Sequence, residues 1–200
     1  MNVIIDHKLG NIFSVYSACK YLGYECKISS SRNEIKSASK LILPGVGHFT
    51  EGMKNLRELN LLDILNYKVC EQKTKILGIC LGSQLLLEFS EESREEKGFG
   101  WIKGFSKKFD ESNFQTKTHN GWNDVQIKKN IFNNKKQNLK MYFNHSYYPV
   151  LKDNENIVAE TNFQNKFTSI FSKDNIFGIQ PHPEKSQEDG LKFLGDFLKC

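Results

Sequence analysis

The first half of the chain alternates short apolar runs with longer stretches in which apolar residues recur every three or four positions. The short runs predict strands, and the longer stretches predict helices with one apolar face. The predicted strands are 2–5, 26–29, 41–43 and 75–79. The predicted helices are 10–22, 49–56, 61–70 and a segment that follows residue 80 and ends near residue 89. Because strands and helices alternate, we expect βαβ units around a parallel sheet.

The second half of the chain has a different pattern. From Gly98 onward, several short strand-like segments are separated by turn residues, and residues 187–198 form a last helical stretch. Together the two halves predict an α/β fold, with an open, mostly parallel sheet flanked by helices and an additional antiparallel strand layer. The sequence has no internal repeat and no linker, so we expect residues 1–200 to form a single domain.

The composition suits a domain with a sizeable core and argues against membrane and secreted proteins. The 200 residues are 38% hydrophobic, and no segment reaches the roughly 18 consecutive apolar residues of a membrane span. Residues 1–6 enter the first strand directly, without the charged region, apolar region and cleavage site of a signal peptide. We therefore expect a cytoplasmic protein that does not bind a membrane.

Charge and cysteine content narrow the possible partners further. The formal net charge of +5 is mild for this length, and no RNA- or DNA-binding motif is present, so we expect no nucleic-acid partner. The five cysteines, at positions 19, 26, 70, 80 and 200, form no Cys-x-x-Cys pair and no metal-ligand spacing. Disulfides and a structural metal ion are therefore not expected.

Cys80 lies in the most informative segment, where an apolar strand runs into Gly-x-Cys-x-Gly and then into a helix. Glycines on both sides of the cysteine allow a sharp strand-to-helix turn that presents the thiol at its tip. A helix N-terminus there favours the thiolate, which is the nucleophilic form. The alternative interpretation is a buried cysteine in a turn that tolerates glycine, and it is as common for this motif alone.

A histidine about a hundred residues downstream completes a candidate catalytic group. Prolines flank His182, so residues 180–184 are expected to be extended, which places His182 and Glu184 on one face. Glu184 would then orient the imidazole while His182 takes a proton from Cys80, as in covalent hydrolases. Alone, His-Pro-Glu is more often a surface turn, but its combination with the Cys80 motif favours catalysis.

A third segment, Pro44-Gly45-Val46-Gly47, follows an apolar strand. Its flexible backbone with free N–H groups fits an oxyanion hole, and the Leu81 amide after the nucleophile is the natural second donor. In isolation, the same segment is more simply a loop between a strand and a helix.

These residues carry a family resemblance that spans nearly the whole chain. The sequence resembles the triad class of glutamine amidotransferases and, within it, the glutaminase subunits of imidazole glycerol phosphate synthase. The resemblance rests on Asp6 to Val15, Leu43 to Phe49, Leu77 to Gln84, His119 to Asn123, Tyr142 to Tyr148 and Gly178 to Gln187. The Cys80 turn fits the whole class, whereas Gly-Trp-Asn and Tyr-Phe-x-His-Ser-Tyr point to the subfamily.

The resemblance implies a flavodoxin-like fold, glutamine as substrate and no cofactor. It implies that Cys80 attacks the glutamine amide, that His182 and Glu184 complete the triad, and that the Val46 and Leu81 amides bind the oxyanion. The residues it assigns to glutamine binding are Gly47, Gln84, Glu92, Ser146 and Tyr147. Those it assigns to the ammonia exit and partner interface are Trp122, Asn123, Tyr142 and Lys185. The implied partner is a (β/α)8-barrel cyclase in a heterodimer, which uses the ammonia to make imidazole glycerol phosphate and AICAR in histidine biosynthesis.

Four departures from the family pattern leave the acceptor of the ammonia open. Asn120 replaces a common methionine, Ser83 stands where methionine is frequent, and Pro181 replaces the usual aromatic residue before the histidine. The fourth is the first loop, which reads Asp6-His7-Lys8-Leu9. None removes a catalytic group. The alternatives are a paralogous glutaminase subunit that feeds an amidating enzyme of surface-sugar biosynthesis, a stand-alone cysteine hydrolase and a catalytically idle relative. The last is disfavoured because Cys80, His182 and Glu184 are all present.

Overall fold

A computed structural model describes residues 1–110, 118–132 and 136–200. Their central feature is a nine-stranded sheet in the order β2-β1-β3-β4-β13-β12-β11-β8-β9. Its strands are β1 (Asn2–Ile5), β2 (Cys26–Ser29), β3 (Lys40–Leu43), β4 (Lys75–Ile79), β8 (His119–Ile127), β9 (Asn138–His145), β11 (Ile157–Asn162), β12 (Lys166–Lys173) and β13 (Ile176–Ile179). A second, four-stranded sheet has the order β10-β7-β5-β6. Its strands are β5 (Phe89–Ser90), β6 (Ser93–Lys97), β7 (Gly104–Lys108) and β10 (Tyr147–Leu151).

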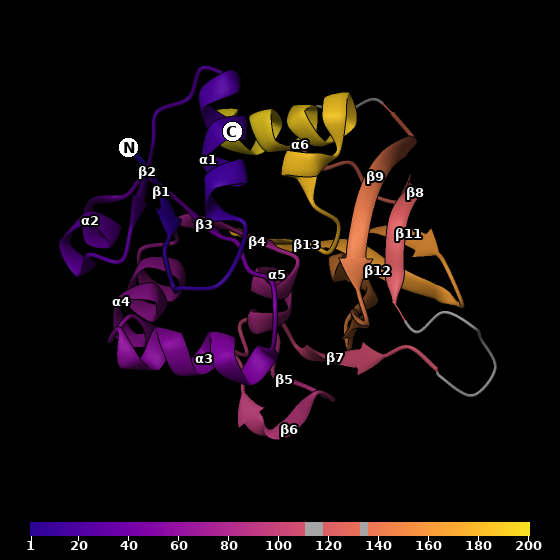
Figure 1. Ribbon diagram of the computed structural model, residues 1–200, viewed down its shortest axis with the longest axis horizontal. Coiled ribbons are helices and arrows are strands. Elements are labelled where there is room, and N and C mark those ends of the chain that lie inside the picture. Colours follow the sequence, from indigo (N-terminus) through magenta and orange to yellow (C-terminus); the bar gives the residue numbers. More distant parts are fainter. Residues whose placement is uncertain (111–117, 133–135) are drawn as a thin grey trace.

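Helices cover both faces of the larger sheet (Figure 1), with α1 and α6 on one side and α3 and α4 on the other. They are α1 (Ile12–Tyr21), α2 (Arg32–Ser37), α3 (Phe49–Glu58), α4 (Leu62–Asn66) with the π-helical turn η1 (Tyr67–Glu71), α5 (Leu81–Leu85) and α6 (Gln187–Lys199). Two 3-10 turns, η2 (Asn154–Asn156) and η3 (Pro183–Lys185), complete the set. Successive strand residues point to opposite faces, so Ile4 packs with α1 and α6 whereas Val3 and Ile5 pack with α3 and α4.

The prediction of an α/β fold is confirmed. Strands β2, β1, β3, β4 and β13 are parallel neighbours, and the pairs from β13 to β9 are antiparallel. Antiparallel strands therefore extend the main sheet and also contribute to the second one. The β4–β13 pair lies in the middle of the large sheet. Parallel sheets of this kind carry their sites at the carboxyl ends of the strands, and Cys80 directly follows β4.

One local prediction was wrong, and one helix was missed. The helix after Cys80 ends at Leu85 instead of near residue 89, because the chain turns there into the second sheet, where Phe89 pairs with Lys97 and Phe105. The short helix α2 was not predicted, since Ile35 is its only buried residue and gives no apolar period.

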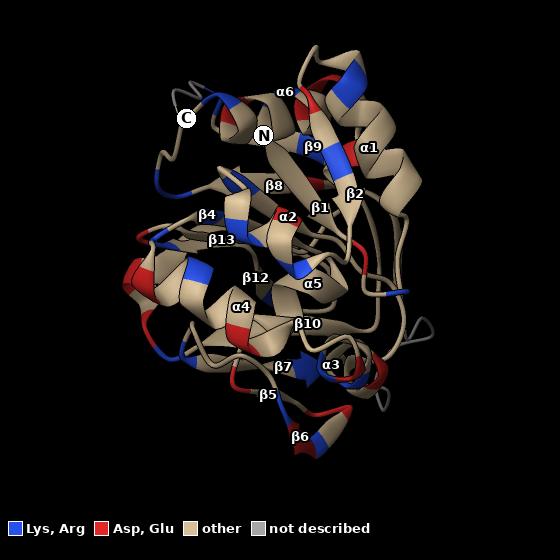
Figure 2. Ribbon diagram, turned by 90° about the vertical axis from the view of Figure 1, so that its left-hand side faces the viewer, with Lys and Arg blue, Asp and Glu red and all other residues tan. Residues whose placement is uncertain are grey.

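Charged side chains do not form a single-sign surface on the elements that face the viewer in Figure 2. Helix α3 and strand β6, for example, each carry both acidic and basic residues. In the described parts of the chain, no helix is both long and apolar enough to cross a bilayer.

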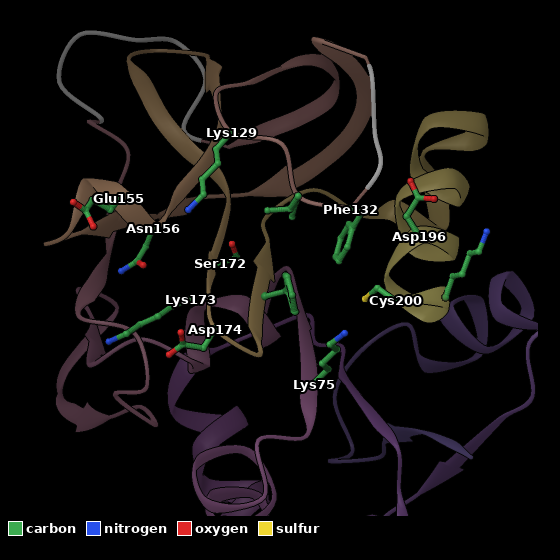
Figure 3. A pocket seen from close by; sticks show the side chains of 13 residues that line it. Lys75, Lys129, Phe132, Glu155, Asn156, Ser172, Lys173, Asp174, Asp196 and Cys200 are labelled. Atoms are coloured by element: carbon green, nitrogen blue, oxygen red, sulfur yellow. The ribbon is translucent and has the colours of Figure 1, made fainter.

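A cavity of about 850 Å³ lies away from Cys80, at the amino end of β4 (Figure 3). Lys75, the first residue of β4, lines it together with Phe132 and Cys200. Its remaining charged residues are of both signs: Lys129, Lys173, Lys199, Glu155, Asp174 and Asp196. This mixture selects no class of ligand, so the candidate active site is placed by its chemistry and not by cavity size.

Candidate active site

The backbone at Cys80 makes the sharp turn that the sequence predicts. Cys80 has φ 52° and ψ −112°, a strained conformation for a residue with a side chain. A Cβ atom on Gly82 would lie 1.8 Å from the Leu43 carbonyl oxygen, and one on Gly78 would lie 2.7 Å from the Gly82 oxygen. Only glycine fits both positions, and this close packing holds the strained turn in place.

The histidine and glutamate predicted to be catalytic are in contact, although the predicted backbone was wrong. His182 is extended, but Glu184 lies in the 3-10 turn η3 because Pro183 starts that turn. His182 Nδ1 lies 2.9 Å from Glu184 Oε1, and both side chains are almost fully buried. Among the described residues, Glu184 Oε2 has no hydrogen-bond partner, so the carboxylate acts mainly on His182.

Burial and polar interactions shift the pKa of His182 in opposite directions. Burial alone would lower its pKa, because a charged group loses hydration. Hydrogen bonds and charge interactions with Cys80 and Glu184 outweigh burial and raise the pKa of His182 to about 10. The raised pKa favours the imidazolium form of His182, and the Cys80 sulfur and the Glu184 carboxylate are its two favourable partners.

The predicted oxyanion hole is closed in this conformation. The Leu81 N–H, one of its two predicted donors, donates to the Gly45 carbonyl oxygen at 3.2 Å. No peptide bond is cis in the described residues, so the Gly45 oxygen and the Val46 N–H of that peptide point in opposite directions. The Val46 N–H, the other predicted donor, thus points away from Leu81. A rotation of this peptide would exchange the two groups.

A pocket of about 260 Å³ opens beside the thiol. It is lined by Val46, Gly47, Cys80, Leu81, Gln84, Glu92, Thr118, Asn144, His145, Ser146 and Tyr147. All five residues predicted to bind glutamine are in this set, and both oxyanion positions border it. The structure thus brings together residues from four distant parts of the chain, while their contacts with a substrate stay predictions.

Contacts within the protein orient two of these polar side chains. The amide nitrogen of Gln84 donates to the Tyr147 carbonyl and to Gln180 Oε1, both at 3.0 Å, so only its oxygen remains for a ligand. Glu92 accepts the Phe49 N–H at 2.6 Å and lies 3.1 Å from His48 Nδ1. Glu92 therefore also fixes the start of α3.

Two of the four predicted interface residues, Tyr142 and Lys185, contact His182, whose backbone carbonyl accepts the Lys185 N–H at 3.0 Å. Trp122 and Tyr142 are opposite each other on β8 and β9, with ring centroids 6.1 Å apart, and Trp122 is 45% exposed. The Lys185 ammonium lies 5.9 Å from the Tyr142 ring centroid. The Tyr142 carbonyl accepts the His182 N–H at 2.9 Å. Asn123, on the same strand as Trp122, donates to the buried His119 at 3.1 Å.

Two functional candidates were not assigned from the sequence. Gln180 donates to the Cys80 sulfur at 3.6 Å, and His145 lines the pocket. Their segments belong to the quoted motifs, but only the fold brings Gln180 to the thiol. In the described parts of the chain, no group of three or more His, Cys, Asp or Glu side chains could hold a metal ion.

Comparison with known proteins agrees with this geometry. The family model "Glutamine amidotransferase class-I" matches residues 3–200. The chain belongs to the class-I glutamine amidotransferase family. It is 47% identical to "Imidazole glycerol phosphate synthase subunit HisH 2" of Methanococcus maripaludis, over all of this chain and 99% of that protein. It is 42% identical to the protein of the same name from Pseudomonas aeruginosa, with the same coverage.

Solved structures show the same fold for this amidotransferase at lower identity. The structure of PurLQS from Thermotoga maritima matches with a TM-score of 0.79 and 22% identity, over 99% of this chain and 97% of that chain. A structure described as a glutamine amidotransferase matches with a TM-score of 0.76 and 18% identity, over 99% of both chains. At these identities the likeness supports the fold alone.

Proposed function

We propose that this chain is the glutaminase subunit of imidazole glycerol phosphate synthase, which releases ammonia from glutamine for a cyclase subunit in histidine biosynthesis. The observation that carries the proposal is the hydrogen bond between His182 and Glu184, with Cys80 among the groups that raise the pKa of His182, in an amidotransferase that is 47% identical to a HisH subunit over its full length. Both the chemistry and the partner follow from this combination.

The first half of the reaction forms a thioester. The Cys80 sulfur attacks the side-chain carboxamide carbon of glutamine, and the C=O electron pair moves onto the oxygen. The Val46 and Leu81 N–H groups stabilise that oxyanion once the Gly45–Val46 peptide has rotated. His182 then gives its proton to the leaving nitrogen, and ammonia departs from the γ-glutamyl thioester.

The second half releases glutamate. A water molecule gives a proton to His182 and attacks the thioester carbon, and the collapse of this second intermediate expels the Cys80 sulfur. Glu184 keeps Nδ1 of His182 hydrogen-bonded in both halves of the reaction. The other ring nitrogen, Nε2, therefore gives the proton to ammonia and takes one from water. The ammonia leaves past Tyr142 and Lys185 into the (β/α)8-barrel cyclase.

The closed oxyanion hole explains why such a subunit would depend on its partner. With the Gly45 oxygen facing the Leu81 N–H, both donors are unavailable and the lone subunit hydrolyses glutamine slowly. A partner that contacts Trp122, Asn123, Tyr142 and Lys185 would favour the rotated peptide, provided that it contacts the two states differently. Ammonia is then released only when an acceptor enzyme is present.

A second candidate keeps the glutaminase chemistry and changes the acceptor to an amidating enzyme of surface-sugar biosynthesis. The observation in its favour is Asn120, which replaces a common apolar methionine and whose Oδ1 accepts the Tyr142 hydroxyl at 2.9 Å. This polar pair lies on the predicted partner surface, where it would match a different protein. A stand-alone cysteine hydrolase has no comparable observation in its favour.

The test measures glutamate and ammonia from glutamine with the chain alone, with a barrel cyclase and its nucleotide-derived substrate, and with a sugar-amidating ligase and its sugar. We expect strong stimulation by the cyclase. Stimulation by the ligase alone would establish the second candidate. The absence of glutamate in all three mixtures would contradict both.

A further inference from the structure

The Cys80 sulfur receives a hydrogen bond from a buried amide that the mechanism above does not use. Gln180 directly follows β13, its side chain is fully buried, and its Nε2 lies 3.6 Å from Sγ. The Gln180 backbone N–H donates to the Ser169 carbonyl at 2.8 Å and fixes the residue against β12. A donor at this distance favours the thiolate over the thiol, since it interacts more strongly with the charged form.

The orientation of the Gln180 amide is set by its neighbour. Gln180 Oε1 accepts from Gln84 Nε2 at 3.0 Å, and the second hydrogen of that nitrogen goes to the Tyr147 carbonyl. If the Gln180 amide were reversed, its nitrogen would face the nitrogen of Gln84 and its oxygen would face the sulfur. The Tyr147 carbonyl, which can only accept, therefore determines which end of Gln180 points at Cys80.

The same Tyr147 carbonyl also accepts a hydrogen bond from His145, the first of two buried imidazoles in series. His145 Nδ1 lies 2.7 Å from this oxygen, so Nδ1 must carry a hydrogen. His145 Nε2 is then an acceptor, 3.1 Å from His119 Nδ1. His119 Nε2 in turn accepts from Asn123 Nδ2 at 3.1 Å. Every donor and acceptor in this series is matched when both imidazoles are neutral.

Burial keeps the two imidazoles in that neutral state. It lowers the pKa of His145 to about 3 and that of His119 to about 4. Aromatic rings pack around both, and Phe143 and Phe163 stack on His119 at 4.3 Å. The pair thus stays neutral near pH 7, where it holds the Tyr147 carbonyl as a fixed acceptor.

We propose that Gln180 is a catalytic residue that donates a hydrogen bond to the Cys80 sulfur, and that Gln84 and the His145–His119 pair position its amide through the Tyr147 carbonyl. This rests on the nucleophilic role proposed for Cys80. It adds a thiolate donor to the triad, and it links the thiol to Asn123 on the predicted partner surface by an unbroken series of hydrogen bonds.

The experiment follows alkylation of Cys80 by iodoacetamide from pH 6 to 10, with peptide mass spectrometry and the whole chain. Gln180→Met keeps the length of the side chain and removes the donor. We expect it to slow alkylation of Cys80 at pH 7 roughly tenfold and to move the midpoint of the profile up by about one pH unit. The exposed Cys70 and Cys200 serve as internal references.

A second variant tests the positioning pair. His145→Phe keeps an aromatic ring and removes the hydrogen bond to the Tyr147 carbonyl, and we expect it to slow alkylation about threefold. In the Gln180→Met background it should have no further effect, because the pair acts only through Gln180. The matched control is Ser169→Ala, since the buried Ser169 hydroxyl has no partner among the described residues.

Two alkylation results would each overturn one part of the proposal. Alkylation of Gln180→Met at the parent rate and midpoint would remove the donor role. Further slowing by His145→Phe in the Gln180→Met background would remove the positioning role. If circular dichroism shows that Gln180→Met is unfolded, Gln84→Met takes its place with the same expected direction. The assay contains no glutamine, so its result is separable from that of the glutaminase test.

Discussion

The segment around Cys80 and the segment 44–47 face each other across one pocket, and they differ in burial and bonding. Cys80 and His182 are 5% and 2% exposed, and their partners are in place. In the other segment, Pro44 and Gly45 are buried, but Val46 and Gly47 are exposed, with Val46 at 39%. A Cβ atom on Gly47 would meet nothing within 4 Å.

Amide hydrolysis needs an activated nucleophile and a pair of oxyanion donors, and these two requirements fall on the two different segments. The predicted nucleophile and its base are held by core packing, so we expect them to be in place without a partner. The predicted oxyanion donors depend on the orientation of one peptide, between the buried Gly45 and the exposed Val46. We therefore expect regulation at the oxyanion site, and the following predictions test that division.

The largest effect is expected at the nucleophile. Cys80→Ala removes the only group that can form the γ-glutamyl thioester, and by analogy with other covalent hydrolases turnover should fall by about 10⁶-fold. Cys70→Ser and Cys200→Ser are the controls, because both side chains are exposed and remote from the pocket. A glutamine-analogue label on a peptide that lacks Cys80, with Cys80 unmodified, would contradict the assignment.

Glu184→Gln should lower turnover less, by about 10⁴-fold, because it misorients His182 and leaves the thiol in place. The loss of the negative charge also removes one of the interactions that raise the pKa of His182. The pH profile of the variant should therefore be displaced to lower pH. Equal losses for Glu184→Gln and Cys80→Ala would mean that Glu184 does more than orient the imidazole.

The oxyanion segment should give a smaller and reversible effect. Addition of the cyclase with its bound substrate is expected to raise glutaminase turnover by at least about 10²–10³-fold, the contribution of a single oxyanion donor, because the rotation frees both donors. Steady-state turnover with and without partner measures this. A lone subunit with full turnover, unchanged by the partner and its substrate, would show that the closed hole does not limit the reaction.

The smallest effect concerns stability in acid. His145 and His119 stay neutral in the folded state because their pKa values are lowered to about 3 and about 4. In the unfolded chain both take up protons below about pH 6.5. Their stabilising contribution is complete above that pH and decreases as the pH falls toward 3, by up to about 1.4 kcal/mol per pH unit for each. Urea unfolding at pH 7 and pH 5 should show a shallower decrease for His145→Phe, and an unchanged slope would contradict this.

Much of the fold and of the site was predictable because local sequence determines it. The strand 75–79 and the glycines around Cys80 follow from steric rules that act within a few residues. The pairing of His182 with Glu184 was also predicted, although Pro183 achieves it through a 3-10 turn and not an extended segment. Their two-residue separation allows contact in either geometry.

Other features depend on tertiary contacts and could not be predicted from the chain. Gln180 reaches Cys80 across 100 positions, because β13 pairs with β4. The orientation of the Gly45 carbonyl depends on which acceptor is nearest to the Leu81 N–H in the folded state. Motif recognition indicates that these segments matter, but it does not say which atoms meet.

The left-handed backbone at Cys80 also limits how this site can evolve. At φ 52° a side chain branched at Cβ is disfavoured, whereas unbranched and small side chains are accommodated. Serine could therefore replace cysteine at this turn with the same backbone, and an oxygen nucleophile could arise there by a single substitution. Threonine, valine and isoleucine would strain the turn, so a nucleophile of the threonine type would have to arise elsewhere in the fold.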